Sequence, residues 1–410
     1  MIDVAVSGRQ ATVVDRSPAV PPIGRQAMDR NKALSVSPPR GQTMQAIVCH
    51  GFEDHSIETV PEPEPENGDV KVAIDRVQLS VTECALYRGQ RIAHYEAIKR
   101  RFEDGPAQVF GHEFCGRVVE LGEDVSSFEI GDRVYAPAKI PCHDCRQCDR
   151  GFELHCPNKT YLGYDTPGAL AEYAVFPAEG LCTVPEGVSD AETAALQPLA
   201  SSILAVDEAD IGTGDVVAVI GTGVMGYQCA QLARTQGART VIGVDVDPEK
   251  LDVLAAHGFE TVNARETDPV QAVEAATAGV GADVVFEAVG GEQSHGTEGS
   301  DPLAQAFGMA RSGGSVVQVG YIIDEISIAP RAVRTKSVDW INPVTGVTAP
   351  TPNTTTGELA GELVDDGRVS LEEYITHELD GLESFETAVE ITLNKAEYGA
   401  RGPAQIVLSE

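Results

Sequence analysis

Residues 216–250, VVAVIGTGVMGYQCAQLARTQGARTVIGVDVDPEK, decide how the rest of the chain is interpreted. The first five residues form an unbroken apolar run, which is typical of a strand buried on both faces of a parallel sheet. Gly221, Gly223 and Gly226 follow in GxGxxG spacing, and a helical stretch and a second strand come after them. This order of strand, glycine turn, helix and strand predicts a dinucleotide-binding unit.

The three glycines have different roles in this prediction. Gly221 permits a tight turn, Gly223 lets the backbone approach a pyrophosphate, and Gly226 lets the helix pack closely on the strand. We expect the pyrophosphate at the helix N-terminus, where backbone N–H groups are unpaired. Asp245, at the end of the second strand, is expected to bridge the adenosine ribose hydroxyls. The alternative is an ordinary glycine-rich turn between a strand and a helix.

The chain has 410 residues, enough for two or three domains, and 63 Asp and Glu against 30 Lys and Arg give a net charge of -33. The acidic residues are spread along the chain, which argues against nucleic acid or an anionic membrane as a partner. Such a surface is typical of a protein from a high-salt cytoplasm, and the alternative is an unusually acidic mesophilic protein. The apolar runs are too short for a transmembrane helix. Nine cysteines without a secretory signal favour a reducing, cytoplasmic compartment.

The pattern along the chain divides it into four segments. Residues 1–43 lack a periodic apolar pattern and are expected to be a disordered extension. Residues 44–198 contain short strands and many turns, which predicts a β-rich domain. Residues 199–345 alternate strands and helices, which predicts an α/β domain with a doubly wound parallel sheet, and residues 346–410 are expected to close back on the β-rich domain. The six strands expected in the parallel sheet are residues 216–220, 240–244, 260–263, 282–287, 314–319 and 336–341.

Four cysteines, Cys142, Cys145, Cys148 and Cys156, follow the spacing CxxCxxCx7C. Four thiolates within a short loop can surround one tetrahedral zinc ion and leave no open position, so the predicted zinc is structural. Unrelated free thiols or disulfides are the alternative.

His112 and Glu113 begin the run GHEFCGRVVELGEDV, whose glycines and Val125 have the spacing GHExxGx5GxxV. An imidazole is a good zinc ligand, and the adjacent carboxylate can bind the metal or a water molecule on it. Together with the four cysteines, the GTGVMG turn and the C-terminal run ITHELDGLESFETAVE, this signature resembles the zinc-containing alcohol dehydrogenases of the medium-chain dehydrogenase/reductase superfamily. The resemblance covers residues 44–410.

The resemblance implies a GroES-like catalytic domain, a Rossmann domain, and an active-site cleft between them. The implied chemistry is hydride transfer between NAD(P) and a small alcohol or its carbonyl, in a homo-oligomer such as a dimer or tetramer. The residues implied to contact the cofactor are Gly221, Gly223, Val224, Met225, Gly226, Asp245 and Gly320. Asp245 is followed by Val246 and Asp247 rather than an arginine, so NAD is expected in preference to NADP.

The expected catalytic metal site departs from the family pattern. Ser80 stands where relatives usually carry a cysteine ligand, and Gln197 stands where polyol dehydrogenases usually carry a glutamate. Because neither brings a negative charge, a zinc ion at Ser80, His112, Glu113 and Gln197 is expected to bind more weakly than the structural zinc. Cys84, one helical turn beyond Ser80, could replace it as a ligand, or it could be an inert buried thiol.

Two further residues complete the expected catalytic group. Thr82 keeps the hydroxyl that relays the substrate proton in similar enzymes, and Glu83 is expected to orient His112 without touching the metal. The sequence thus predicts a zinc-containing, NAD-dependent alcohol or polyol dehydrogenase. Two rival hypotheses are a zinc-independent reductase that acts on an activated double bond and a binding protein that holds NAD without turnover.

Two connections are longer than is usual in this family. Residues 290–301 contain His295, which could contact a substrate or lie in a solvated loop. Residues 88–101 carry five basic residues, and Arg91, Lys99, Arg100 and Arg101 could attract a carboxylate or phosphate on the substrate. The alternative is a surface helix whose cations pair with acidic neighbours or a second subunit.

Overall fold

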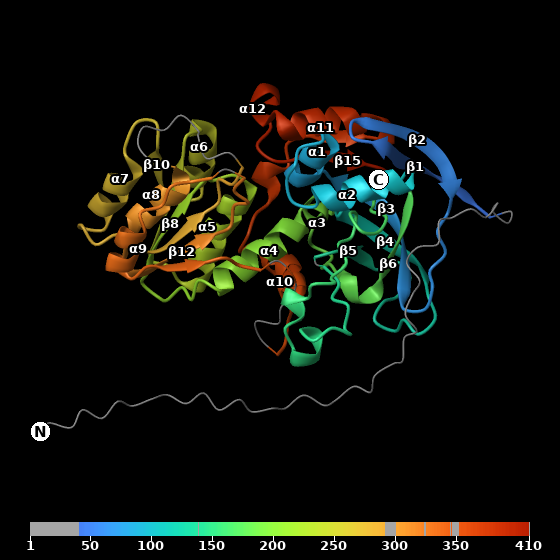
Figure 1. Ribbon diagram of the computed structural model, residues 1–410, viewed down its shortest axis with the longest axis horizontal. Coiled ribbons are helices and arrows are strands. Elements are labelled where there is room, and N and C mark those ends of the chain that lie inside the picture. The colour runs from blue at the N-terminus through green and yellow to red at the C-terminus, as the bar shows by residue number, and fades with distance from the viewer. Residues whose placement is uncertain are drawn as a thin grey trace, which may run out of the picture. The chain divides into compact units, whose positions relative to one another are not determined.

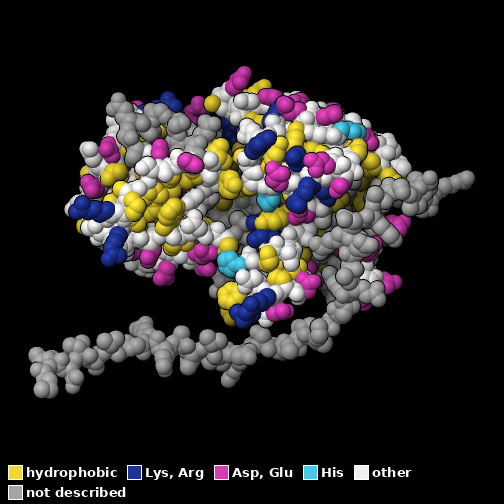
Figure 2. Space-filling view, in the orientation of Figure 1, with side chains coloured by type: hydrophobic (Ala, Val, Ile, Leu, Met, Phe, Trp, Pro, Cys, Tyr) yellow, Lys and Arg dark blue, Asp and Glu magenta, His cyan; other side chains and the backbone are white. Residues whose placement is uncertain are grey.

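The computed structural model describes residues 41–137, 139–291, 301–323, 325–344, 346 and 352–409 (Figure 1). The expected disordered extension and His295 therefore lie outside the described residues, apart from Gly41, Gln42 and Thr43. No helix within the described residues is long and apolar enough to cross a membrane. Asp and Glu side chains are spread over the visible face of the molecule rather than gathered in one patch (Figure 2).

Six parallel strands form one sheet in the order β10-β9-β8-β11-β12-β13. This order, in which the first strand lies in the interior and later strands extend to both sides, is that of a doubly wound Rossmann sheet. All five residues of β8 are buried, as expected of a strand covered on both faces. The strands are β8 (Val216–Ile220), β9 (Thr240–Asp245), β10 (Glu260–Asn263), β11 (Ala282–Glu287), β12 (Ala310–Gln318) and β13 (Asp339–Ile341). The predicted α/β fold class is confirmed.

Helices lie against this sheet and connect its strands. Figure 1 shows α5 to α9 around the strands of the Rossmann sheet. The helices are α5 (Val224–Gln236), α6 (Pro248–Ala256), α7 (Pro269–Ala276), α8 (Pro302–Met309) and α9 (Pro330–Lys336). Four of them, α6 to α9, begin with a proline in the first turn, where the missing N–H costs no hydrogen bond.

A second sheet of seven strands is mainly antiparallel and forms the GroES-like β domain. Its strand order is β14-β15-β3-β4-β5-β7, and β6 also pairs with β3. Because β15 pairs antiparallel with β3, the C-terminal segment completes the sheet that the N-terminal segment begins. The strands are β3 (Asp69–Gln78), β4 (Glu113–Leu121), β5 (Arg133–Tyr135), β6 (Tyr173–Pro177), β7 (Cys182–Thr183), β14 (Glu378–Asp380) and β15 (Gln405–Val407).

The remaining elements surround this β domain and join it to the Rossmann sheet. A separate hairpin pairs β1 (Thr43–Gly51) with β2 (Asp54–Pro61). The helices are α1 (Val81–Tyr87), α2 (Tyr95–Asp104), α3 (Asp190–Ala194), α4 (Leu196–Asp207), α10 (Thr356–Asp365), α11 (Phe385–Leu393) and α12 (Lys395–Tyr398).

Three elements differ from the sequence prediction, and the first is β12, which was expected at residues 314–319 but spans Ala310–Gln318. Residues 336–338 were expected in a strand, but Lys336 ends helix α9, and β13 begins only at Asp339. The Lys336 ammonium donates hydrogen bonds to the carbonyl oxygens of Gly308 and Ala310, at 2.7 and 2.9 Å, so it fixes the end of helix α8 instead. Strand β2 was not expected because its sequence, DHSIETVP, is largely polar and no residue in it is fully buried.

The glycine turn after β8 depends on two of its three glycines for packing. Gly221 has φ +84°, and a Cβ there would lie 2.6 Å from the Val289 backbone nitrogen. A Cβ on Gly226 would overlap the carbonyl oxygen of Gly221, whereas a Cβ on Gly223 would meet no atom within 4 Å. Gly223 therefore faces open space above the N-terminus of α5. Gly221 and Gly226 are required by packing, because a side chain at either position would overlap neighbouring backbone atoms.

Substitution of Gly226 by alanine should destabilise the fold, because helix α5 has to move away from the turn to admit the methyl group. Overpacking of this kind costs about 1–3 kcal/mol. The matched control is Gly223→Ala, which should cost about 1 kcal/mol or less, since it only removes a favourable cap residue. Urea unfolding followed by circular dichroism measures both. Equal losses in the two variants would contradict the packing role of Gly226.

Candidate active site and structural zinc lobe

The N-terminal cap of helix α1 places the Glu83 side chain in the protein interior. The Ser80 hydroxyl caps the helix by accepting a hydrogen bond from the Glu83 backbone nitrogen at 3.1 Å. The Glu83 side chain is consequently buried, with the residue only 1% exposed. A buried carboxylate needs hydrogen-bond donors, and His112 supplies two.

His112 lies immediately before β4 and is held by Glu83. Glu83 Oε1 accepts hydrogen bonds from the His112 backbone nitrogen at 3.1 Å and from its Nδ1 at 2.7 Å. Because a carboxylate can only accept, Nδ1 carries a proton and Nε2 is the ring atom left for chemistry. Nε2 lies 3.8 Å from Glu113 Oε1. The other Glu113 oxygen accepts a hydrogen bond from Gln78 Nε2 at 2.6 Å.

This arrangement shifts the pKa of both groups. Burial lowers the pKa of His112, but the charge of Glu83 and its hydrogen bond outweigh burial and raise that pKa to about 9. Burial raises the pKa of Glu113 to about 7, against the opposing effects of His112 and Gln78. Glu83 therefore favours the charged form of the His112 imidazole, and either a proton or a cation at Nε2 can polarise a substrate oxygen.

The donors around His112 suit a weakly bound divalent cation. His112 Nε2 and Glu113 Oε1 are close enough to share one ion, but together they bring only one negative charge. The Ser80 hydroxyl is already used as a helix cap and by a hydrogen bond with Tyr164. The Cys84 thiol forms a hydrogen bond with Thr392, and burial raises the pKa of this thiol. Both facts favour the alternative that Cys84 is an inert buried thiol rather than a metal ligand. The residues therefore fit a weak metal site and do not fit a thiolate zinc site.

Two other predicted site residues lie near helix starts. Thr82 is partly buried in the first turn of α1. Gln197 is partly buried in the first turn of α4, and in the described part of the chain no hydrogen bond joins its side chain to His112 or Glu113. The structure thus brings Ser80, Glu83, His112 and Glu113 together and leaves Gln197 without a direct link to them.

The predicted cofactor residues surround the start of α5. Asp245 Oδ2 accepts hydrogen bonds from the Thr222 backbone nitrogen and hydroxyl, at 2.7 and 2.9 Å, so it holds the glycine turn in place. Its Oδ1 accepts from the backbone nitrogens of Val246 and Asp247, at 2.7 and 3.0 Å. The open space at Gly223 and the uncapped first turn of α5, with Val224, Met225 and Gly226, suit a pyrophosphate.

A small cavity is lined by residues next to both groups of site residues. Its lining includes Gln78, which bonds with Glu113, and Val224, the first residue of helix α5. Gly320 lies just beyond the carboxyl end of β12, and its backbone nitrogen donates to the Glu287 carbonyl oxygen at 2.9 Å.

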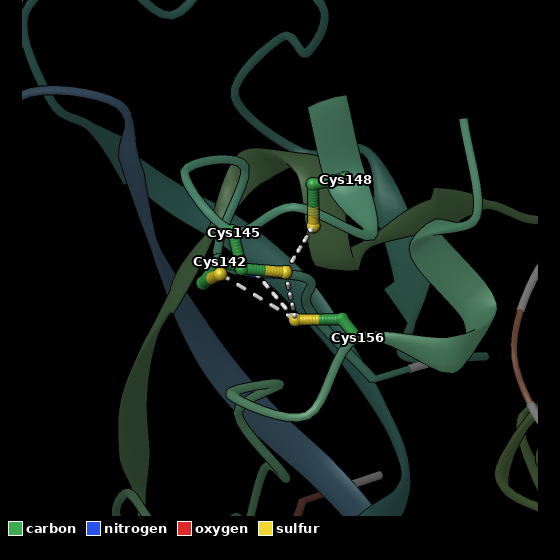
Figure 3. A group of neighbouring side chains, drawn as sticks. All are labelled: Cys142, Cys145, Cys148 and Cys156. Atoms are coloured by element: carbon green, nitrogen blue, oxygen red, sulfur yellow. Dashed lines mark hydrogen bonds between the residues drawn. The ribbon is translucent and has the colours of Figure 1, made fainter. Parts of the chain in front are cut away.

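The four cysteines converge, as predicted. Their sulfur atoms point toward one another from the loop between β5 and β6 (Figure 3). Sulfur separations are 3.5 Å for Cys145–Cys148, 3.9 Å for Cys145–Cys156 and 3.5 Å for Cys142–Cys156. Four sulfurs at about 2.3 Å from one zinc ion are about 3.8 Å apart in a tetrahedron, so the spacing fits a structural zinc site.

The basic residues of segment 88–101 already have partners. Arg88 pairs with Glu386 and Glu390, and Lys99 lies 3.6 Å from Glu103. Arg91 lies over the Tyr95 ring, while Arg100 and Arg101 donate to the carbonyl oxygens of Glu96 and Asp165. These contacts favour the alternative of a surface helix, α2, paired with its own neighbours.

Three side chains that act on or near His112 were not identified in the sequence analysis. Tyr164 is 5% exposed and its ring centroid lies 5.3 Å from that of His112. His94 stacks on Tyr164, with the centroids 4.6 Å apart. The charge of Lys139 acts on both histidines. No motif contains these residues, because they meet only through tertiary packing.

Comparisons with known proteins agree with this architecture. The family model described as the alcohol dehydrogenase GroES-like domain matches residues 66–186, and that described as zinc-binding dehydrogenase matches residues 224–356. The erythritol/L-threitol dehydrogenase of Mycolicibacterium smegmatis is 31% identical over 295 residues, which cover 70% of this chain and 79% of that protein. The L-threonine 3-dehydrogenase of Bacillus licheniformis is 30% identical over 87% of this chain and 97% of its own length. Among solved structures, the alcohol dehydrogenase of Thermus sp. ATN1 superposes with a TM-score of 0.72 and 26% identity, covering 89% of this chain and 99% of that one.

Substitution of Cys145 by serine should remove the zinc from the lobe, because the hydroxyl is a much weaker ligand than a thiolate. Metal analysis should show the loss of about one zinc ion per chain, and thermal unfolding should shift to lower temperature. Cys182→Ser is the control, since Cys182 lies outside the lobe and should leave the lobe zinc in place. A Cys145→Ser protein with wild-type zinc content would refute the assignment of the site.

Proposed function

The chain belongs to the zinc-containing alcohol dehydrogenase family of the medium-chain dehydrogenase/reductase superfamily, and we propose that it oxidises an alcohol or polyol with NAD at His112 and Glu113. It is an NAD(P)-dependent dehydrogenase with a structural zinc site. The observation that carries the proposal is the pairing of His112 Nε2 with Glu113 Oε1 at 3.8 Å, while Glu83 holds Nδ1 from behind.

Each side chain of the proposed site has a separate role in the oxidation of the alcohol. A divalent ion held by His112 and Glu113, when bound, supplies Lewis-acid polarisation of the alcohol oxygen. Glu83 fixes the orientation of the His112 ring, and Gln78 fixes that of the Glu113 carboxylate. Thr82 accepts the hydroxyl proton and passes it outward. The alcohol carbon gives its hydride to NAD, so the products are a carbonyl compound, NADH and a proton.

The preference for NAD rests on two carboxylates near the expected ribose. Asp245 is held by the Thr222 turn, and Asp247 caps helix α6 with its side chain partly exposed. A 2′-phosphate would meet both negative charges, whereas a ribose hydroxyl can donate to Asp247, because each Asp245 oxygen already accepts two hydrogen bonds.

The absence of a thiolate ligand supports a second candidate function. The Ser80 hydroxyl is engaged by Tyr164 and the α1 backbone, and the Glu83 carboxylate favours the charged form of the His112 imidazole. A zinc-independent reduction in which the His112 imidazolium donates the proton is consistent with these contacts.

The high-salt origin, the cytoplasmic location and the homo-oligomer stay predictions.

Substitution of His112 by alanine tests the proposed site. Alcohol oxidation should fall by about 100-fold or more, because both the metal ligand and the proton site are lost. NAD affinity, measured by fluorescence titration, should change little, since Gly223 and Asp245 are untouched. The control is His50→Ala, because His50 is an exposed histidine on the β1–β2 hairpin that pairs with Glu58.

Mild chelation distinguishes the two candidate functions. Under the proposed function, activity disappears while the lobe zinc is still bound, because the His112 site holds its ion more weakly. Activity that persists until the lobe zinc is lost would assign the protein to the zinc-independent class. Failure of a broad alcohol panel to produce any NADH would reject the proposed function.

Asp247→Ser tests the cofactor preference without removing the helix cap, because serine also caps helices well. The wild type should use NAD with a kcat/KM at least about tenfold above that for NADP, and the variant should narrow this ratio. Glu249→Ser is the control, because it removes one negative charge from a neighbouring position on α6, and it should leave the ratio of kcat/KM values unchanged. Equal use of both cofactors by the wild type would show that the assignment is wrong.

A further inference from the structure

A residue from outside the Rossmann sheet contacts its glycine turn. Tyr374 belongs to the C-terminal segment, which completes the GroES-like sheet through β15. The Tyr374 hydroxyl donates a hydrogen bond to the Thr222 carbonyl oxygen. Thr222 is 0% exposed, and within the described residues its carbonyl oxygen has no other hydrogen-bond donor. Because a buried carbonyl group needs a hydrogen bond, Tyr374 supplies a contact that the turn itself does not provide.

The hydroxyl of Tyr374 is held in place by the packing around it. The Tyr374 ring stacks on that of Tyr227, with the centroids 5.1 Å apart, and only 4% of the residue is exposed. Nearby, Gln231 of helix α5 bonds with the Ser370 backbone nitrogen and carbonyl oxygen, at 2.8 and 3.0 Å. Burial, followed by the charge of Asp245, raises the pKa of Tyr374. The hydroxyl therefore keeps its proton at neutral pH and can act as a donor.

This hydrogen bond also orients the backbone N–H of the next residue. The peptide bond between Thr222 and Gly223 is trans, so its C=O and N–H groups point in opposite directions. Because the C=O group points at Tyr374, the Gly223 N–H points away from the C-terminal segment. Within the described residues this N–H has no acceptor, and Gly223 is partly exposed. It is therefore a free donor at the N-terminus of α5, where an anion can bind.

The peptide between Thr222 and Gly223 needs a restraint of this kind. Asp245 binds the Thr222 backbone nitrogen and hydroxyl, but neither contact holds the Thr222 carbonyl group. Glycine adopts positive and negative φ about equally well, so the peptide can rotate at low cost on the Gly223 side. A rotated peptide would present a carbonyl oxygen instead of an N–H group to a bound anion. The hydrogen bond from Tyr374 opposes that rotation.

We propose that Tyr374 is a positioning residue for the cofactor, because its hydroxyl fixes the Thr222–Gly223 peptide with the Gly223 N–H free for the pyrophosphate. The inference rests on the proposed function, since it takes the glycine turn as the cofactor site. The ligand class is any compound with a pyrophosphate, such as NAD or ADP-ribose. The site is then complete only when the segment around Tyr374 packs against α5.

The experiment compares ADP-ribose, which has the pyrophosphate, with adenosine, which has no phosphate. Calorimetric titration of the variant Tyr374→Phe should show a Kd for ADP-ribose about fivefold above that of the wild type, as expected for the loss of one hydrogen bond. The Kd for adenosine should stay the same, whereas a general loosening of the domain would weaken both ligands. In turnover assays the KM for NAD should rise and kcat should change little. The ratio of NAD to NADP use should be unaffected, because Asp247 is untouched.

Tyr227→Phe is the matched control, because Tyr227 stacks on Tyr374 but its hydroxyl contacts Glu373, at 3.4 Å, instead of the turn. This variant should bind ADP-ribose like the wild type. An unchanged Kd for ADP-ribose in Tyr374→Phe, or an equal loss for both ligands, overturns the inference and leaves the proposed function standing. A wild type that binds no ADP-ribose rejects the cofactor site and the inference with it.

Crystal structures of the wild type with and without ADP-ribose decide the matter if Tyr374→Phe does not fold. The same orientation of the Thr222–Gly223 peptide in both structures, with the Gly223 N–H on a phosphate oxygen, supports the inference. A peptide that is rotated in the ligand-free protein overturns it.

Discussion

The arrangement of the candidate site depends on the buried carboxylate of Glu83. One of its oxygens accepts hydrogen bonds from both the backbone and the ring of His112, at 3.1 and 2.7 Å. This fixes the ring orientation and the tautomer together, and it ties helix α1 to the start of β4. Because Ser80 caps α1 through the Glu83 backbone nitrogen, it sets the direction in which Glu83 leaves the start of the helix. A serine hydroxyl supplies this cap without bringing a negative charge to the site.

The glycine turn of the Rossmann domain relies on a comparable buried carboxylate. Asp245 binds the backbone nitrogen and hydroxyl of Thr222, and the Tyr374 hydroxyl donates to the Thr222 carbonyl oxygen. Thr222 is thus held from the Rossmann sheet and from the C-terminal segment. A turn fixed in this way leaves Gly223 facing open space without relying on the cofactor to order it. Pre-organisation of this kind reduces the entropic cost of binding a dinucleotide.

Features that are local in sequence could be predicted, and those that arise from tertiary packing could not. The strands at residues 216–220, 260–263 and 282–287 were predicted with the bounds that the structure shows, because each is a short run between clear turn signals. His112 and Glu113 were found through motif spacing, and Glu83 through the resemblance of residues 80–83 to the family's pattern. Strand β2 was missed because its pairing with β1, rather than its own composition, makes it a strand. Tyr164 and His94 were missed because nothing in the sequence near either residue indicates that they stack beside His112.

The cations of helix α2 and the lysines Lys139 and Lys159 differ in how far they are exposed to solvent and in the partners they contact. On helix α2 the cations are mostly exposed and meet carboxylates or carbonyl oxygens of the protein, so an incoming anion would have to displace these partners. Water and salt screen such exposed pairs, and their attraction for a substrate is correspondingly small. Lys139 is partly buried, and its pKa is lowered by burial and by Lys159. Since screening is weaker where water is partly excluded, a partly buried cation such as Lys139 interacts more strongly with neighbouring charges than an exposed cation on α2 does.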